Sequence, residues 1–287
     1  MKNKRVFFFG CSCTHYGWPT WADAVGHTLH ARGYEYYNFG MPGSGNDLIF
    51  KTMLRAKQEH NITSDDLIMV MWTSWNREDR YTRTTPGDPC IAWELQGSVL
   101  NNAIYDDDFL SKHWSLEHDI ITSISAITAA HTLFNIDFVS SLPVTENSVG
   151  SSDDPLVAEL EQLNMPHQMQ DFSYNDIIRR YDGHPDMIAV LNFVDQVVTP
   201  VTGIVLEQNT RAMLAEFDEF MTNITAPLSG LDFSTGSRLW KSDIFENIMN
   251  HHDDQKQQYR MPYSGSSLWD CNNIVDYLKV FGNQAWR

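Results

Sequence analysis

Three short apolar runs, separated by segments with helical spacing, constrain the fold of this chain most strongly. The runs are RVFFF (5–9), YEYYNFG (34–40) and SDDLIMVMW (64–72). Between them, apolar residues recur at helical spacing from Pro19 to Gly33 and again over 48–54. Strands and helices that alternate at this pacing indicate a parallel α/β sheet. The third run is almost continuously apolar, which is typical of a strand covered on both faces.

The rest of the chain continues this pattern with two interruptions, mixed segments at 77–113 and 142–181. A fourth strand is expected at 134–141. Further helices are expected over 114–132, 155–163, within 182–198, and over 205–223, 240–250 and 273–281. We therefore expect an α/β domain over residues 1–199 and a helical C-terminal extension over 200–287 that packs on it.

The composition predicts a soluble globular protein. Of the 287 residues, 42% are hydrophobic and 20% are charged, and no run approaches the roughly 18 to 20 apolar residues of a membrane helix. The basic start is followed only by Val6 to Phe9, which is too short for a secretory signal, so we expect a cytoplasmic protein. The net charge of −17 argues against a nucleic-acid partner. Four scattered cysteines, at positions 11, 13, 90 and 271, predict reduced thiols.

Polar clusters follow the predicted strands, at the edge where open parallel sheets bind their ligands. Ser12 follows the first run, Gly43 to Asn46 follow the second, and Thr73 to Asn76 follow the third. A fourth cluster, DGHP at 182–185, precedes a predicted helix. Acyl transfer needs a nucleophile, a base with an orienting carboxylate, and oxyanion donors, and these clusters contain all of them.

In these motifs the sequence resembles the SGNH (GDSL-type) hydrolases. Gly10-Cys11-Ser12 stands where that family has its Gly-Asp-Ser nucleophile turn, and NFGMPG (38–43) matches its Asn-x-Gly-x-x-Gly turn. DGHP is similar to the family's last block, which supplies an aspartate and a histidine. The resemblance covers residues 5–76 and 182–198 in order. It implies a three-layer α/β/α sandwich with a mostly parallel, flavodoxin-like sheet, and it implies no cofactor.

The resemblance implies a serine ester hydrolase and assigns its catalytic triad. Ser12 is expected to attack, His184 to act as general base, and Asp182 to orient the histidine. The last block is one residue shorter than the common Asp-x-x-His-Pro, which puts the role of Asp182 in question. The fallback orienting residues are Asp171, Asp176 and Asp186.

The oxyanion donors are assigned in the same way. The N–H groups of Ser12 and Gly43 are expected to hold the oxyanion, with Asn76 or Ser74 as a further donor. The third block reads WTSWNR and lacks the glycine of the family's Gly-x-Asn-Asp, so the two side chains compete for this role. The expected substrate is a small ester, with an acetylated carbohydrate as the first choice. Nearby aromatics, Trp18 and Trp75 among them, either stack on a sugar ring or anchor the core.

Other classes of protein remain as alternatives. SGNH-like domains with GCS starts resemble proteins encoded by tailed phages. The scaffold would then serve a structural or glycan-binding protein of a virion, with the extension mediating assembly or homo-oligomer formation. Acyl transfer to a sugar is a further alternative within the enzymes. A metal site at Cys11, Cys13 and His15 has the wrong spacing for zinc, and HHDD (251–254) is expected to be a polar loop.

Overall fold

The structure of the protein is a computed structural model that describes residues 4–75, 77, 79–83, 93–96, 107–141, 169, 184–226 and 243–258. Its centre is a four-stranded parallel sheet in the order β2-β1-β3-β6. The strands are β1 (Lys4–Gly10), β2 (Tyr34–Gly40), β3 (Leu67–Trp72) and β6 (Phe138–Ser141). All four lie within or close to the apolar runs that predicted them, and their parallel pairing confirms the expected α/β class.

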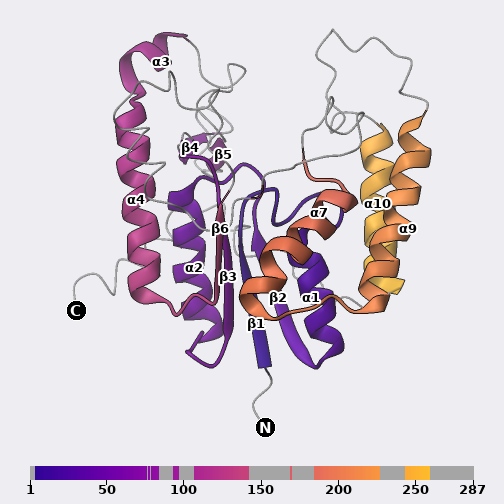
Figure 1. Cartoon of the computed structure of the whole chain (residues 1–287). Coiled ribbons are helices and arrows are strands. Elements are labelled where there is room, and N and C mark those ends of the chain that lie inside the picture. Colours follow the sequence, from indigo (N-terminus) through magenta and orange to yellow (C-terminus); the bar gives the residue numbers. More distant parts are fainter. Residues whose placement is uncertain are drawn as a thin grey trace.

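Helices cover both faces of the sheet and complete three layers (Figure 1). The helices are α1 (Trp21–Ala31) and α7 (Met187–Phe193) on one face, and α2 (Asn46–His60) and α4 (Leu116–Leu133) on the other. Successive residues of β1 therefore enter two separate cores. Val6 and Phe8 pack in the core of the α1 face, and Phe7 and Phe9 pack in the core of the α2 face. The predicted three-layer sandwich is confirmed.

Two C-terminal helices form an outer layer beside α1 and α7. Helix α9 (Gln208–Thr225) packs on α1 and α7, and α10 (Asp243–Gln258) packs on α9 (Figure 1). Phe217 of α9 and Ile248 of α10 are fully buried in the same core as Phe8. Within the described ranges, no helix combines the length and the apolar character needed to cross a membrane.

The helical segment that begins with α7 continues past Pro200, where the sequence pattern predicts a change of character. It passes through one π-helical stretch, η2 (Val194–Val198), into the short helix α8 (Thr199–Thr202), and ends at Gly203 with φ of +71°. A proline has no N–H to donate and crowds the carbonyl of the preceding turn. A wider turn just before Pro200 is a common way to absorb such a residue. The predicted domain boundary between 199 and 200 therefore falls inside a helix.

The predicted irregular excursion at 77–113 contains regular elements. Strands β4 (Arg80–Arg83) and β5 (Trp93–Gln96) pair in antiparallel fashion, and helix α3 (Asp107–His113) follows them. Elements of four and seven residues are too short to give a clear period in the sequence. The helices predicted at 155–163 and 273–281 lie outside the described residues.

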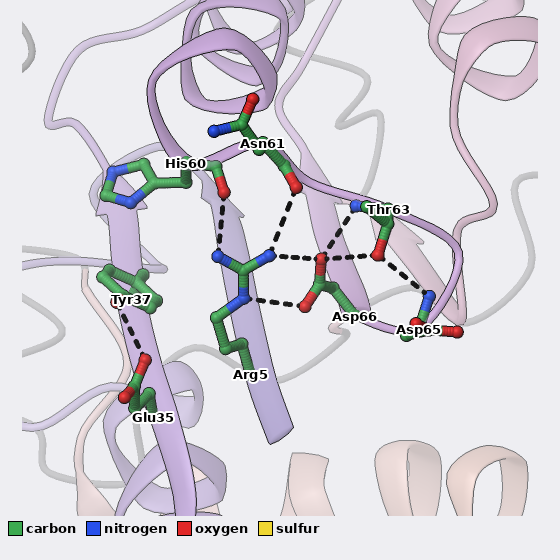
Figure 2. Close-up of polar contacts among 8 residues, drawn as sticks. All are labelled: Arg5, Glu35, Tyr37, His60, Asn61, Thr63, Asp65 and Asp66. Atoms are coloured by element: carbon green, nitrogen blue, oxygen red, sulfur yellow. Dashed lines mark hydrogen bonds and ion pairs between the residues drawn. The ribbon is translucent and has the colours of Figure 1, made fainter. Parts of the chain in front are cut away.

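At the amino-terminal end of the sheet, the Arg5 side chain joins three elements (Figure 2). Its guanidinium donates to both carboxylate oxygens of Asp66, at 2.8 and 2.6 Å. It also donates to the carbonyl oxygens of His60, at 2.8 Å, and Asn61, at 3.3 Å. Asn61 ends α2 in the left-handed conformation, with φ of 48°. Arg5 on β1 therefore fixes both the end of α2 and the start of β3.

Candidate functional site

The carboxyl ends of the strands bring the predicted nucleophile turn and the predicted oxyanion turn together. Gly10 of β1 pairs with Gly40 of β2, and the Met41 N–H donates to the Gly10 carbonyl oxygen at 3.0 Å. From this point the chain runs toward Ser12 on one side and toward Gly43 on the other. Parallel strands direct all their carboxyl ends to one edge, so the two turns share the edge at which open α/β sheets bind ligands.

Ser12 lies in a tight turn and is only 5% exposed. The N–H groups of Thr14 and His15 both donate to the Cys11 carbonyl oxygen, at 2.9 and 3.2 Å. These two bonds make the segment a coiled turn and not an extended strand. Neither cysteine forms a disulfide, as predicted, and both are buried. A hydrogen bond from Cys13 lowers the pKa of the Cys11 thiol well below its usual value.

Two side chains fix the far end of this turn by binding the Thr14 carbonyl oxygen. Asn38 Nδ2 donates to it at 2.8 Å, and Thr20 Oγ1 donates to it at 2.7 Å. Asn38 Oδ1 also accepts from the Gly40 N–H at 2.9 Å, so one amide side chain links the two loops. Thr20 starts α1 through a capping box with Asp23. The turn that carries Ser12 is therefore held from both β2 and α1.

The close approach of the two loops leaves no room for a side chain at Gly40. A Cβ there would lie 2.7 Å from His15 N and 2.9 Å from Thr14 C, and backbone atoms cannot rotate away. We expect Gly40→Ala to lower the free energy of unfolding by about 2–3 kcal/mol, as overpacking does. It should also shift the amide resonances of the Ser12 turn.

Gly33→Ala is the control for this prediction, because a Cβ at Gly33 meets nothing within 4 Å and only the φ of +84° is strained. Urea unfolding and an amide NMR spectrum of each variant measure the two effects. Equal movement of the Ser12 turn in both variants would contradict the steric explanation.

Gly43 occupies the turn after β2 with φ of +84°, a conformation that glycine adopts without strain. The Ser44 N–H and hydroxyl both donate to the Met41 carbonyl oxygen, at 3.2 and 2.8 Å, and close the turn. Gly45 follows as the residue that precedes α2. The backbone N–H groups of this turn lie at the same sheet edge as Ser12, which is the location expected for an oxyanion donor.

Asn46 ties this turn to the end of β3. Its Oδ1 accepts from the Thr73 N–H at 2.9 Å, and its Nδ2 donates to the Thr73 carbonyl at 3.2 Å and to Ser123 Oγ at 3.1 Å. Both ends of the amide are thus used in structural bonds. Ser74, a predicted oxyanion donor, follows Thr73 and is half-buried at this edge. The other predicted donor, Asn76, lies outside the described residues.

His184 contacts the loop of the predicted nucleophile from a distant part of the sequence. Its imidazole stacks on Tyr16, with ring centroids 3.7 Å apart and planes inclined by 20°. Trp18 lies edge-on to both rings, and its Nε1 donates to the Pro185 carbonyl oxygen at 2.8 Å. Phe245 of α10 packs on Tyr16 and Trp18 with centroid distances of 5.7 and 6.0 Å. The structure thus joins the loop of the predicted nucleophile to the segment of the predicted base.

Of the carboxylates predicted to orient His184, the structure describes Asp186. Asp182, Asp171 and Asp176 lie outside the described residues. Asp186 is 2% exposed and starts α7, where its Oδ1 accepts from the Ala189 N–H at 2.9 Å. This bond assigns Asp186 a helix-capping role.

Trp18 and Trp75, predicted as stacking surfaces for a sugar, lie in two different cores. Their side chains are 1% and 5% exposed. Trp18 packs in the core of the α1 face, and Trp75 packs in the core of the α2 face. A ring whose faces are covered by protein cannot also stack on a ligand. The burial therefore favours the alternative in which both residues anchor the core.

The HHDD motif at 251–254 lies inside α10, so the expectation of a polar loop is wrong. His252 is 3% exposed, and His251 stacks on Phe220 of α9 at 3.8 Å. One helical turn further, Gln255 Nε2 donates to the Met213 carbonyl oxygen at 2.9 Å. These contacts pack His251, His252 and Gln255 against α9, whereas Asp253 and Asp254 are exposed. In the part of the chain that the structure describes, no three His, Cys, Asp or Glu side chains are grouped to hold a metal ion.

One residue at this edge was not identified by sequence patterns. Asp79 accepts from the N–H groups of Gly45, at 2.6 Å, and Leu48, at 2.7 Å, and so caps α2 from a distant segment. The signal for such a contact is Gly45 itself, since a glycine before a helix has no side chain with which to cap it.

Comparison with known proteins gives neighbours only among solved structures. No family model matches the chain, and no curated protein matches it. A member of the lipolytic protein G-D-S-L family from Veillonella parvula is 13% identical, over 89% of this chain and 97% of that one, with a TM-score of 0.26. An acetylxylan esterase from Geobacillus stearothermophilus is 14% identical, over 92% of this chain and 97% of that one, with a TM-score of 0.27. Likeness at this level does not by itself assign a function.

Proposed function

We propose that the protein is a serine ester hydrolase of SGNH type that acts on a short acyl ester. The observation that carries the proposal is the stacking of His184 on Tyr16 at 3.7 Å, four residues beyond Ser12 on the same loop. Nucleophilic catalysis by serine needs a base within reach of the hydroxyl, and this contact supports such an arrangement. The turn at Gly43 supports it from the other side, because a backbone N–H is the usual donor to an oxyanion.

In the first half of the reaction, Ser12 Oγ attacks the carbonyl carbon of the ester and His184 takes the hydroxyl proton. The carbonyl π electrons move to the oxygen, and the N–H groups of Ser12 and Gly43 stabilise the negative charge that develops there. Ser74 or Asn76 is the proposed third donor. When the tetrahedral intermediate collapses, the C–O bond to the alcohol breaks and His184 gives its proton to the leaving oxygen.

In the second half, water attacks the acyl-Ser12 ester while His184 again accepts a proton. Collapse releases the carboxylic acid and returns the proton to Ser12 Oγ. Asp182 is the proposed orienting residue for the imidazole. All of these groups belong to the chain itself, so the reaction as proposed needs no metal or cofactor.

The burial of Ser12 supports a small acyl group. With 5% of the residue exposed, an acetyl group is a better fit than a long acyl chain, which would need an open apolar groove beside the nucleophile. An acetylated carbohydrate is the proposed alcohol component, following the habits of the SGNH family.

Covalent trapping tests the proposal directly. We expect the wild type to hydrolyse 4-nitrophenyl acetate faster than 4-nitrophenyl octanoate. Incubation with diethyl 4-nitrophenyl phosphate should add one diethylphosphoryl group, located by peptide mass spectrometry on Ser12, and should stop turnover. Ser12→Ala should take up no such group. An adduct on Ser12→Ala at the wild-type rate, or the absence of both turnover and adduct in the wild type, would reject the proposal. The second result would favour a structural or glycan-binding protein on the same scaffold.

A further inference from the structure

Helix α2 begins without a cap of its own. Its preceding residue is Gly45, which has no side chain to bind the unpaired N–H groups of the first turn. Asp79 supplies the missing acceptor from a segment 34 residues away, with Oδ1 on the Gly45 N–H at 2.6 Å and Oδ2 on the Leu48 N–H at 2.7 Å. A carboxylate at a helix N-terminus also interacts favourably with the helix dipole.

The segment that carries Asp79 lies directly against the turn that carries Gly43. A Cβ at Gly45 would be 2.3 Å from the Arg77 carbonyl oxygen and 2.7 Å from Asp79 Oδ2. Only a glycine allows this approach. The Arg77 guanidinium adds a long contact of 3.5 Å to the Ser44 carbonyl oxygen. Residues 44 and 45, which follow Gly43 immediately, are thus held by two residues of one distant segment.

We propose that Asp79 is a positioning residue for the reaction: its carboxylate holds the Gly43–Asn46 segment in the conformation that presents the Gly43 N–H to the oxyanion. This inference rests on the proposed function. Asp79 itself need not touch the substrate, since it acts through the backbone of the turn. Small displacements matter here, because misplacing a catalytic group by about 1 Å can cost about 100-fold in rate.

The pKa of Asp79 allows a positioning role to be told apart from a role in stabilising the fold. Burial raises the pKa of Asp79 to about 7, against the two amide hydrogen bonds that lower it. The charged groups that face it from α2 are Asp47, which also raises this pKa, and Lys51, which lowers it and pairs with Asp47. The folded protein therefore binds this proton more tightly than the unfolded chain. Between the two pKa values, the free energy of unfolding decreases as pH rises. Ionisation of Asp79 in the folded protein therefore lowers the free energy of unfolding, although the carboxylate holds the turn in place.

The test compares Asp79→Asn with Asp47→Asn. Both remove one carboxylate near the start of α2, but the Asp47 carboxylate pairs with Lys51 and, among the described residues, makes no hydrogen bond to the Gly43 turn. In the wild type, we expect the amide proton shifts of Gly45 and Leu48 to titrate with a midpoint near pH 7. In Asp47→Asn the titration should persist with a lower midpoint, because the carboxylate of Asp47 raises the pKa of Asp79. In Asp79→Asn the titration should be lost. The side-chain amide of this variant has one acceptor oxygen for two N–H groups, so one of the two bonds is lost. The variant should lose about 10- to 100-fold in kcat for 4-nitrophenyl acetate, with KM little changed.

The outcomes separate this inference from the proposed function. If the wild type hydrolyses no ester while the two amides titrate as expected, the proposed function fails and the anchoring contact stands without a catalytic role. If the wild type is active and Asp79→Asn keeps the kcat of Asp47→Asn, the positioning role is refuted and the proposed function survives. Amide shifts that still titrate in Asp79→Asn would refute the anchor itself.

Discussion

Replacing Ser12 with alanine is expected to reduce kcat/KM for 4-nitrophenyl acetate on the order of 10⁴-fold or more. The substitution removes the attacking oxygen and leaves only binding and the oxyanion donors. The free energy of unfolding should remain near that of the wild type, because the turn is held by backbone bonds to the Cys11 carbonyl and by side chains on the Thr14 carbonyl. The Ser12 hydroxyl is not needed for these bonds.

The same experiment should reveal that Ser12 and His184 act as one unit. His184→Ala alone is expected to reduce kcat/KM nearly as much as Ser12→Ala does. The double variant should reduce kcat/KM little more than either single variant. Independent residues would instead give losses that multiply. Ser125→Ala is the matched control, since Ser125 is an exposed serine on α4 whose hydroxyl only bonds the Ile121 carbonyl. Multiplying losses, or a Ser12→Ala variant as active as Ser125→Ala, would exclude the proposed nucleophile and base.

The location of the site could be predicted because it depends on local patterns and on one topological rule. Each apolar run is followed by a glycine or a polar cluster, and parallel strands direct their carboxyl ends to one edge. Ser12, Gly43 and Ser74 therefore fall at the same edge once the sheet is known to be parallel. The pairing of Gly10 with Gly40 is the structural result of that rule.

The partners of the site could not be predicted, because they depend on packing between distant elements. Tyr16 meets His184 only where the segment before α7 docks on the loop after β1, and α10 brings Phe245 against Tyr16 and Trp18. The Asp79 carboxylate binds the start of α2 from a position 34 residues further along the sequence, and no periodic pattern in the sequence predicts this contact. Hydrophobic patterning predicts the first half of α10 but misses its continuation, where His252 is buried beside the Phe217 ring although its neighbours in the sequence are polar.

The two ends of the sheet carry different kinds of polar contact. At the carboxyl end, most of the bonds near Ser12 and Gly43 go to backbone atoms of turns. At the amino end, Arg5 and Asp66 form a forked ion pair that fixes the ends of elements (Figure 2). Loss of the Ser12 hydroxyl at the first end should therefore change the rate with little effect on stability, and loss of the ion pair at the second end should change stability.

Arg5→Met is expected to lower the free energy of unfolding by about 3–5 kcal/mol, because it leaves the Asp66 carboxylate buried without its partner. The Asp66 side chain is 2% exposed and that of Arg5 is 15% exposed, so water cannot replace the lost bonds. The carbonyl oxygens of His60 and Asn61 also lose a donor. Domains are typically stable by about 5–15 kcal/mol, so this loss is a large share of the total.

Arg211→Met is the matched control, because Arg211 makes the same forked pair with Asp195 at the surface, where the two side chains are 40% and 41% exposed. A solvent-exposed pair is worth about 0–1 kcal/mol, so its loss should be small. Urea unfolding of both variants at pH 7 measures the difference. If the two arginine substitutions lower the free energy of unfolding by the same amount, burial does not strengthen the Arg5–Asp66 pair, and the prediction is wrong.

The pH dependence of stability tests the same pair independently. Burial alone would raise the pKa of Asp66, but the hydrogen bonds from Arg5 and from the Thr63 N–H outweigh it and lower the pKa below its usual value. A lowered pKa stabilises the folded protein above the pKa of the unfolded chain, and this contribution disappears as pH falls through the folded value. The difference in the free energy of unfolding between wild type and Arg5→Met should therefore be largest at pH 7 and should decrease as the pH falls into the acid range. A difference that stays constant down to the acid limit of folding would mean that Arg5 acts through its packing and its bonds to the end of α2, and not through the charge of Asp66.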